Sequence, residues 1–357
     1  MAEDVIFFGA GASVPEGAPV QGNLFEKYFS LQLDGKFDEI NKRLNSFFKD
    51  FFAIDIENDN LKKINFPTFE EILGILELSL DRRESFKNYG LDHNFPEIQQ
   101  IRQDLIFLIA ITIGEELKKS ELYKDSNKDK RCHEKLIKRL VDDDNILHTD
   151  FISLNYDIIL DNALTDMQSK YNLDLDYGIE FTNFEKDYGW SYWRRPRPQK
   201  AVHLYKPHGS LNWLYCPTCI STTLTPEQKG VVELFYKPKE CKNCGSRMIP
   251  IIIPPTFFKV MSNRYLQEIW YKAEDALKNA KRIYFCGYSF PDADIHIKYL
   301  LKKAELNGNS NPEIYVINGE SRKIKSKETQ SRYERFFKGN VNWTGKKFEY
   351  FCENDIK

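Results

Sequence analysis

Four of the seven cysteines fall in two Cys-x-x-Cys pairs, Cys216 with Cys219 and Cys241 with Cys244. Each pair can present two thiolates to one metal ion, and two pairs complete the tetrahedral set that zinc prefers. The gap between the pairs is one residue longer than the usual range of about 15 to 20. Four thiolates leave no open coordination position, so we expect a structural Zn2+ in a small ribbon module at about residues 212–250.

Polar residues follow two predicted strands at the point where each strand ends. Asn155-Tyr156-Asp157 comes after the apolar stretch 150–154, and Lys206-Pro207-His208-Gly209-Ser210 comes after 202–205. Carboxyl ends of parallel strands line the ligand crevice of a sheet, so Asn155, Asp157 and His208 could meet at one site. A histidine there could act as a general base near neutral pH. The same residues could instead cap a helix and a turn.

A glycine-rich turn, Gly9-Ala10-Gly11-Ala12-Ser13, follows the buried strand predicted over 5–8. Glycine lets a backbone approach a diphosphate closely, and the N-terminus of the next helix would supply N–H donors. The general fingerprint has a further glycine three residues after Gly11, where this chain has Val14. A tight strand-to-helix turn with no ligand is therefore the alternative interpretation.

The segment Trp190–Arg197 combines aromatic and cationic side chains in the way that suits stacking on nucleic-acid bases. The formal net charge of the whole chain is −2, which gives such a patch little electrostatic support. We expect this loop to pack on the helical block or on another subunit, with at most weak or indirect binding of nucleic acid.

Strands alternate with helices along the rest of the chain, which predicts an α/β fold with a Rossmann-like parallel sheet. Later strands are expected at 282–286, followed by Gly287-Tyr288-Ser289, and at 313–317, followed by Asn318-Gly319. Residues 23–145 have helical spacing and form a large helical insertion. The sheet domain then comprises residues 1–22 and 146–357.

The composition excludes two classes of protein. With 41% hydrophobic residues among 357, the chain can bury a core and is not a disordered polymer. Its longest apolar run, residues 105–114, is about half the roughly 20 residues that a membrane span requires. The acidic start of the chain does not fit a secretory signal. We therefore expect a cytoplasmic protein that has no membrane contact.

Taken in this order, the motifs resemble those of the sirtuin family of NAD-dependent enzymes. The first glycine turn resembles the family's GAG-A-S nucleotide loop, and Gly17-Ala18-Pro19 resembles the start of its Gly-Ile-Pro-Asp-Phe-Arg segment. The segment 153–157 is similar to Thr-Gln-Asn-Ile-Asp, and His208-Gly209 is similar to the catalytic His-Gly pair. The four cysteines match the zinc module, and Gly287-Tyr288-Ser289 matches the Gly-Thr-Ser loop.

The resemblance implies a role for each matched residue. Asn155 and His208 would be catalytic, and Asp157 would hold the nicotinamide carboxamide. NAD itself would be bound by the two glycine turns, by one proline and by one asparagine that meets the adenosine ribose: Gly9, Ala10, Gly11, Ala12, Ser13, Pro19, Gly287, Tyr288, Ser289 and Asn318.

Two departures from the deacylase pattern bear on the reaction. Val20-Gln21-Gly22 stands where deacylases have Asp-Phe-Arg, so the phenylalanine that shields the reactive sugar from water is missing. The segment 290–294, Phe-Pro-Asp-Ala-Asp, replaces the Val-x-Pro strand that pairs with a peptide substrate. The combination of Asn-Tyr-Asp at 155–157, Lys-Pro-His-Gly-Ser at 206–210 and Gly-Tyr-Ser-x-Pro-Asp-x-Asp at 287–294 resembles the sirtuin-like NADases of prokaryotic antiphage systems.

That subgroup implies an NAD+ hydrolase that yields nicotinamide and ADP-ribose and halts phage growth by depleting NAD. It also implies assembly as a homo-oligomer or with a partner such as a HerA-like ATPase or a short Argonaute. Two alternatives remain open at this point. One is an NAD-dependent protein deacylase, and the other is a non-catalytic sensor of NAD or ADP-ribose that regulates a partner.

Overall fold

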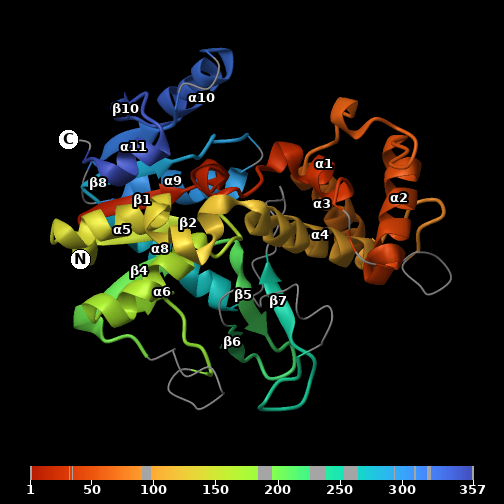
Figure 1. Cartoon of the computed structure of the whole chain (residues 1–357), viewed down its shortest axis with the longest axis horizontal. Coiled ribbons are helices and arrows are strands. Elements are labelled where there is room, and N and C mark those ends of the chain that lie inside the picture. Colours follow the sequence, from red (N-terminus) through yellow and green to blue (C-terminus); the bar gives the residue numbers. More distant parts are fainter. Residues whose placement is uncertain are drawn as a thin grey trace.

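A parallel sheet forms the centre of the computed structural model (Figure 1). The structure describes residues 2–31, 33, 35–90, 98–183, 195–225, 239–252, 264–292, 294–308, 311–319 and 323–355. Within these residues the sheet has seven strands, all parallel, in the order β10-β9-β8-β1-β2-β4-β3. Their bounds are β1 Asp4–Phe8, β2 Thr149–Ser153, β3 Asp174–Asp176, β4 Ala201–Tyr205, β8 Arg282–Cys286, β9 Glu313–Ile317 and β10 Val341–Trp343. The predicted Rossmann-like fold class is confirmed.

The central strand β1 is buried along its whole length, as expected for a strand that is covered on both faces of a parallel sheet. Its last residue, Phe8, lies opposite Ser153 of β2 and Cys286 of β8. The three strands therefore end at the same level, and the turns that follow them are neighbours. The chain passes from β1 to β2 on one side and occupies β8 on the other, which makes this edge a topological switch point.

Helices cover both faces of the sheet (Figure 1). On one face α5 packs against α6 and α11, and on the other α8 packs against α9. The bounds of these helices, together with α10 near the C-terminus, are α5 Cys132–Asp142, α6 Ile159–Tyr171, α8 Arg264–Asn279, α9 Ile295–Asn307, α10 Lys323–Phe336 and α11 Phe348–Glu353. Their apolar faces share one core with the strands.

A helical block lies beside the sheet and has a core of its own (Figure 1). It consists of α1 Leu24–Phe29, α2 Asp38–Phe52, α3 Phe69–Arg82 and α4 Ile98–Lys119. A capping box starts α3: the Thr68 hydroxyl accepts from the Glu71 amide, and the Glu71 carboxylate accepts from the Thr68 amide. The apolar run at 105–114 is the buried centre of α4. None of the helices within the described ranges is long and apolar enough to cross a membrane.

Helix α5 lies within the predicted helical insertion but packs in the core of the sheet. The boundary at residue 145 assigned α5 to the helical insertion, but its apolar residues Leu136, Ile137 and Leu140 pack in the core of the sheet. The sequence could not predict this packing, because an amphipathic pattern shows that one face of a helix is buried but does not show which element covers that face. The sheet core therefore includes α5, and the boundary of the helical insertion at residue 145 stays a prediction.

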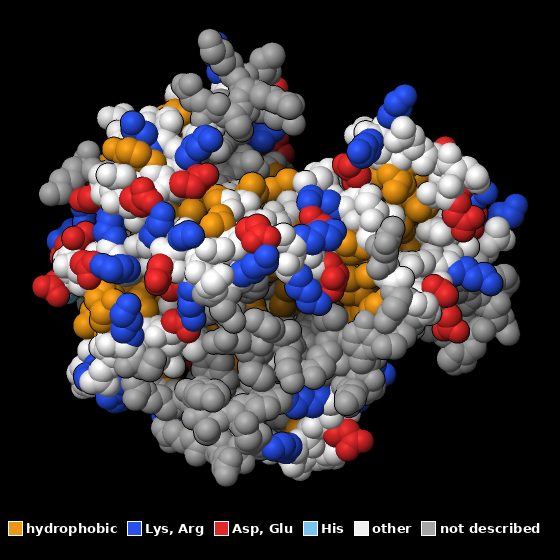
Figure 2. Space-filling view, in the orientation of Figure 1, with side chains coloured by type: hydrophobic (Ala, Val, Ile, Leu, Met, Phe, Trp, Pro, Cys, Tyr) orange, Lys and Arg blue, Asp and Glu red, His pale blue; other side chains and the backbone are white. Residues whose placement is uncertain are grey.

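A second, antiparallel sheet continues directly from β4. It has the order β6-β5-β7, with β5 at Gly209–Tyr215, β6 at Thr222–Leu224 and β7 at Ile249–Ile252. The turn between β4 and β5 carries His208. On the outside, acidic and basic side chains are interspersed over the face in Figure 2, in keeping with the small net charge.

Candidate active site

A cavity of about 650 Å3 opens at the carboxyl edge of the parallel sheet. Residues from four turns line it: Gly9–Gly11 after β1, Leu154–Asp157 after β2, Gly287–Ser289 after β8 and Asn318-Gly319 after β9. His208, from the turn that links β4 to β5, joins them. The structure thus brings Asn155, Asp157 and His208 to one cavity, where parallel α/β sheets bind their ligands.

The two glycine turns in this cavity are interlocked. The Gly9 amide donates to the Cys286 carbonyl at 3.0 Å, and the Gly11 amide donates to the Gly287 carbonyl at 2.9 Å. A Cβ atom on Gly11 would lie 2.7 Å from the Gly287 carbonyl oxygen, and one on Gly9 would lie 2.7 Å from the Tyr288 Cα. Gly9 and Gly11 are therefore required because the backbones of the two turns approach each other closely. This requirement holds whether or not a ligand binds at the turn.

The element after the first turn is a pair of short 3-10 turns, Ala10–Ala12 and Val14–Glu16, where the sequence suggested a helix N-terminus. The Ala12 amide donates to the Gly9 carbonyl and the Ser13 amide to the Ala10 carbonyl. Together with Gly9 and Gly11, these amides are used inside the protein. A diphosphate at this turn would therefore need further donors.

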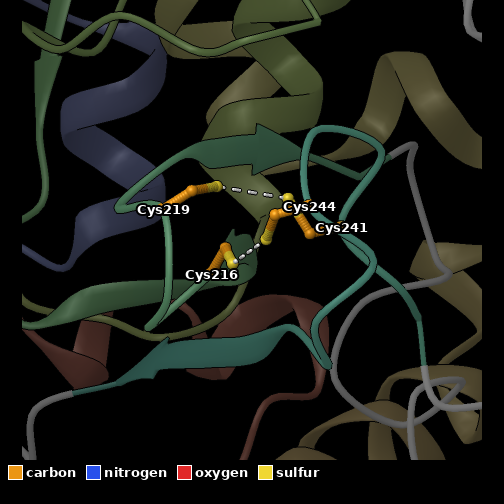
Figure 3. Close-up of side chains that lie close together, drawn as sticks. All are labelled: Cys216, Cys219, Cys241 and Cys244. Carbon is orange, nitrogen blue, oxygen red and sulfur yellow. Dashed lines mark hydrogen bonds between the residues drawn. The ribbon is translucent and has the colours of Figure 1, made fainter.

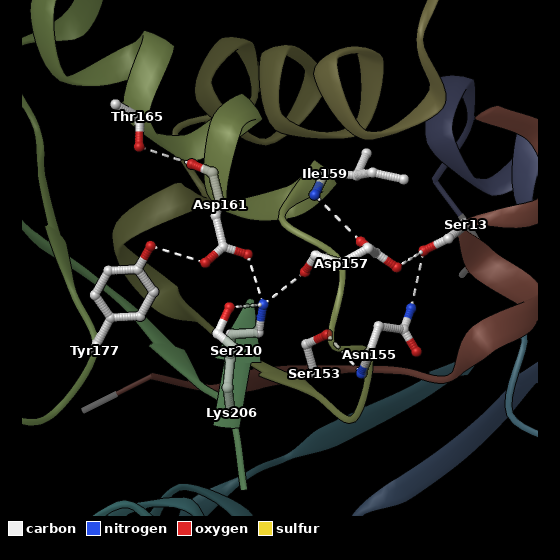
Figure 4. A network of polar contacts seen from close by, with 10 residues as sticks. All are labelled: Ser13, Ser153, Asn155, Asp157, Ile159, Asp161, Thr165, Tyr177, Lys206 and Ser210. Atoms are coloured by element: carbon white, nitrogen blue, oxygen red, sulfur yellow. Dashed lines mark hydrogen bonds and ion pairs between the residues drawn. The ribbon is translucent and has the colours of Figure 1, made fainter. Parts of the chain in front are cut away.

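The side-chain amide of Asn155 makes two hydrogen bonds, and Figure 4 shows the one to Ser13. Its Nδ2 donates to the Gly9 carbonyl at 3.0 Å and to the Ser13 hydroxyl at 2.9 Å, so the plane of the amide is fixed. The Ser13 hydroxyl in turn donates to Asp157 at 2.8 Å. Since both amide protons of Asn155 are used, its carbonyl oxygen is the atom left to accept a hydrogen bond from a ligand or a water molecule.

Asp157 is buried, and its other carboxylate oxygen accepts from the Ile159 amide at 3.2 Å. Burial raises the pKa of Asp157. The Lys206 ammonium group, the Ser13 hydroxyl and His133 oppose the rise but do not cancel it, so the pKa remains above its usual value. Such a carboxyl group takes up a proton more readily than an ordinary aspartate.

His208 is almost fully buried, with 3% of its surface exposed. Its ring lies 6.2 Å from the ring of Tyr156, which is the middle residue of the Asn155–Asp157 turn. This proximity puts the imidazole beside that turn at the wall of the cavity. A histidine in such a position can take a proton from a nucleophile that is bound in the cavity.

The far end of the cavity lies beside β8 and β9. The Tyr288 hydroxyl donates to Asp294 at 3.0 Å, and the Tyr333 hydroxyl donates to the Tyr288 carbonyl at 2.9 Å. These bonds fix the turn that contains Gly287–Ser289. Helix α10, which the sequence pattern did not predict, adds Glu328, Thr329 and Arg332 to the lining. Nothing in the polar pattern of α10 distinguishes these residues from a solvated helix face.

The helical block also lines the cavity, which the sequence analysis did not anticipate. Leu24 of α1, Phe69 of α3, and Ile109 and Ile113 of α4 form an apolar wall, and Val20 and Gln21 precede it in the chain. The spacing of Ile109 and Ile113 is that of any buried helix face, so the sequence alone could not separate core from cavity wall.

A family model described as "SIR2-like domain" matches residues 149–341. The chain belongs to the SIR2-like family. No curated protein matches the chain. Among solved structures, one titled "Structural Basis for the Mechanism and Regulation of Sir2 Enzymes" is 15% identical, with a TM-score of 0.42, and the match covers 98% of this chain and 89% of that one. Another, "Sir2-p53 peptide-NAD+", is 12% identical over 98% of this chain and 90% of that one, with a TM-score of 0.39.

Most of the residues that the SIR2-like motifs single out line the cavity. They are Gly9, Ala10, Gly11, Pro19, Asn155, Asp157, His208, Gly287, Tyr288, Ser289 and Asn318. Ala12 and Ser13 are buried behind the lining, where Ser13 bonds to Asn155 and Asp157. For Ser13 this placement indicates a supporting contact rather than a direct contact with a ligand.

The Trp190–Arg197 segment lies only partly within the described residues, because 190–194 fall outside them. The described arginines of this segment form ion pairs within the chain: Arg195 with the exposed Glu180, and Arg197 with the buried Asp174. Arg197 also donates to the Asn172 side chain at 3.0 Å. These contacts of the described part of the loop are with β3 and the residues on either side of it, and not with the helical block as predicted.

The four cysteines gather at the outer end of the antiparallel sheet (Figure 3). All four Sγ atoms lie within 4.8 Å of one another, with 3.4 Å between Cys216 and Cys244 and 3.5 Å between Cys219 and Cys241. Tetrahedral zinc with sulfur ligands at about 2.3 Å requires sulfur separations of about 3.8 Å. The cluster therefore fits a zinc ion closely, and a four-thiolate site would be structural.

Proposed function

We propose that this SIR2-like protein is an NAD+ glycohydrolase. Water attacks C1′ of the nicotinamide ribose, the N-glycosidic bond breaks with its electron pair going to nicotinamide, and ADP-ribose and a proton are the other products. The observation that carries the proposal is the meeting of Asn155, Asp157 and His208 in one cavity with the Gly287–Ser289 turn and Asn318.

The contacts of these residues suggest how they divide the work. The side-chain carbonyl oxygen of Asn155 accepts a hydrogen bond from the ribose hydroxyl or from the attacking water. It is held in place because the Nδ2 of the same amide donates hydrogen bonds to Gly9 and Ser13. His208 accepts the proton that the water loses. Asp157 binds the carboxamide of nicotinamide, and its raised pKa suits a carboxyl group that exchanges hydrogen bonds with a neutral partner. The turns after β8 and β9 hold the adenosine half.

The segment after Ser289 favours water over a peptide as the acceptor. Phe290 has a positive φ of 53° and is buried, packed on Tyr333 at 4.6 Å and on Phe336 at 4.8 Å between ring centroids. A bulky residue in this conformation bends the chain sharply. The bend takes the place of the extended strand with which deacylases pair their peptide.

The apolar wall of the helical block favours one second candidate, an NAD-dependent deacylase. Phe69, Ile109 and Ile113 offer the kind of surface that an acyl chain would contact. An acyl-peptide assay separates the two reactions, because deacylation consumes the acyl peptide together with NAD+ and hydrolysis consumes NAD+ alone. A non-catalytic sensor would bind NAD+ and consume neither substrate.

We further propose that hydrolysis serves cytoplasmic antiphage defence by depletion of NAD. This role rests on the combined motifs Asn-Tyr-Asp, Lys-Pro-His-Gly-Ser and Gly-Tyr-Ser-x-Pro-Asp-x-Asp, which resemble those of prokaryotic defence NADases. As in that subgroup, the active form would be a homo-oligomer or a complex with a partner such as a HerA-like ATPase. The trigger would then lie on the partner or in the infected cell.

The test is to incubate the purified protein with NAD+, alone and with lysate from phage-infected cells. Nicotinamide and ADP-ribose are followed by chromatography, and a folded His208→Ala variant is the control. We expect release that depends on His208 and, for a triggered enzyme, on the lysate. NAD+ that binds without being cleaved in either condition would refute hydrolysis and favour the sensor. Consumption of an acyl peptide would favour the deacylase.

A further inference from the structure

Lys206 is a buried cation at the back of the site. Its side chain has no exposed surface, and its Nζ donates to the Asp157 carbonyl at 2.7 Å, the Asp161 carboxylate at 2.9 Å and the Ser210 hydroxyl at 2.7 Å (Figure 4). A lysine ammonium group has three N–H donors. All three are therefore used, each by a different acceptor.

The three acceptors lie on three different segments. Asp157 belongs to the turn after β2, Asp161 to the first turn of α6, and Ser210 to the start of β5. Lys206 itself lies two residues before His208. The ammonium group thus connects the turn that carries Asn155 and Asp157 with the turn that carries His208.

Asp161, the charged partner, is itself held in place. Its second carboxylate oxygen accepts from the Tyr177 hydroxyl at 2.8 Å. The Tyr177 ring packs edge-on against Trp213 of β5, with 5.3 Å between centroids and 87° between planes. Both rings are fully buried. The buried rings of Tyr177 and Trp213 therefore hold the Asp161 carboxylate in place, and Asp161 in turn holds the Lys206 ammonium group.

Stability alone does not account for such a pair. Desolvation of two buried charges offsets much of their attraction, and a neutral replacement of both partners is often tolerated. Geometry provides a different reason, because a displacement of about 1 Å in a catalytic group can lower the rate about a hundredfold.

We propose that Lys206 is a positioning residue, which fixes the His208 turn against the Asn155–Asp157 turn for cleavage of the glycosidic bond. This inference rests on the proposed function. The Gly287–Ser289 turn and Asn318, which follow β8 and β9, receive none of the three Lys206 hydrogen bonds. Loss of Lys206 should therefore lower the chemical rate and leave the affinity for the dinucleotide nearly unchanged.

The test uses the double variant Lys206→Met with Asp161→Asn, which removes both charges of this ion pair together. The matched control is Arg197→Met with Asp174→Asn. It removes another ion pair with a buried carboxylate, from the β3 edge of the same sheet. ADP-ribose titration by calorimetry counts folded sites, so that kcat is expressed per binding site in every protein.

For Lys206→Met with Asp161→Asn we expect kcat per site to fall roughly tenfold to a hundredfold. The KM for NAD+ and the Kd for ADP-ribose should stay within about twofold of wild type. The control pair should keep the wild-type kcat per site. A kcat per site within about twofold of wild type in the Lys206 double variant would overturn the inference, because a structural role alone lowers only the number of sites.

A second readout does not depend on turnover. The His208 ring signals in nitrogen-15 spectra, assigned by their loss in His208→Ala, should shift or split in the Lys206 double variant and stay in place in the control. Unchanged signals would overturn the positioning role. If the wild type releases no nicotinamide, the proposed function fails, and these signals still decide the inference about Lys206.

Discussion

The Ser13 hydroxyl, on the glycine turn after β1, donates a 2.8 Å hydrogen bond to the Asp157 carboxylate on the turn after β2. It also accepts from the Asn155 side chain. One small residue from the first turn therefore sets the orientation of two proposed catalytic groups from the second. Its hydroxyl is buried, so water cannot replace it without rearrangement.

Ser13→Ala should lower kcat for NAD+ hydrolysis roughly tenfold to a hundredfold, because a hydrogen bond to a charged group contributes about 1.5–3 kcal/mol. The measurement is the steady-state release of nicotinamide. Ser79→Ala is the matched control, since Ser79 is also buried but lies in the helical block, where it bonds to the Glu84 carbonyl. A Ser13→Ala protein with the kcat of the control would contradict the role of Ser13.

Asp157→Asn should stabilise the fold increasingly, relative to wild type, as pH rises and should lower the turnover of NAD+. Because burial holds the pKa of Asp157 above its ordinary 3.8, wild-type stability is favoured at low pH and is lost as pH rises through the folded-state pKa. The variant has no such charge to bury. We therefore expect its Tm relative to wild type to increase from pH 4 to pH 8, while its turnover falls.

Asp292→Asn is the control for that series. Asp292 is exposed, and its bond to Lys298 lowers its pKa, so its pH dependence has the opposite sign. Melting curves at matched ionic strength measure both differences. A Tm difference for Asp157→Asn that is constant or shrinks with pH would show that the Asp157 carboxylate costs the fold nothing.

The sequence predicts the parts of the site whose signals are local. Gly9, Asn155 and His208 each follow an apolar strand in the sequence. Because the strands of a parallel sheet end at the same edge, the sequence predicts that these three residues lie at one edge. Lys206 could not be found in this way, because a lysine after a strand is normally solvated. Its burial depends on Asp161 and Tyr177, which tertiary folding brings to it.

Glu16 and His133 form a buried pair beside the first glycine turn, with 2.7 Å between a carboxylate oxygen and Nδ1. Burial opposes both charges, yet the pair holds the pKa of Glu16 below and that of His133 above their ordinary values, 4.5 and 6.5. The Glu16 contribution is lost as pH falls through its folded-state pKa. The His133 contribution is lost as pH rises through its own.

Glu16→Gln should therefore destabilise the protein by about 3 kcal/mol near pH 6, where both groups are charged, and by less at pH 9. Urea unfolding at the two pH values gives the difference. Lys118→Gln, which breaks an exposed pair with Glu115, should change stability by less than about 1 kcal/mol at either pH. Equal losses from Glu16→Gln at pH 6 and pH 9 would contradict a charged pair.

Metal exchange should show that the four-cysteine site supports the fold and takes no part in the chemistry. Protein that holds Co2+ in place of Zn2+ should keep kcat within about twofold, because four thiolates leave no position for substrate. Removal of the metal, or Cys219→Ser, should lower Tm and loosen the β5–β7 sheet, since metal binding and folding are coupled. Because β5 starts at Gly209, directly after His208, turnover should fall together with the folded fraction and not ahead of it. Parallel measurements of bound metal, Tm and nicotinamide release check whether turnover follows the folded fraction. A loss of kcat in protein that is still fully folded would instead show that the metal takes a direct part in the reaction.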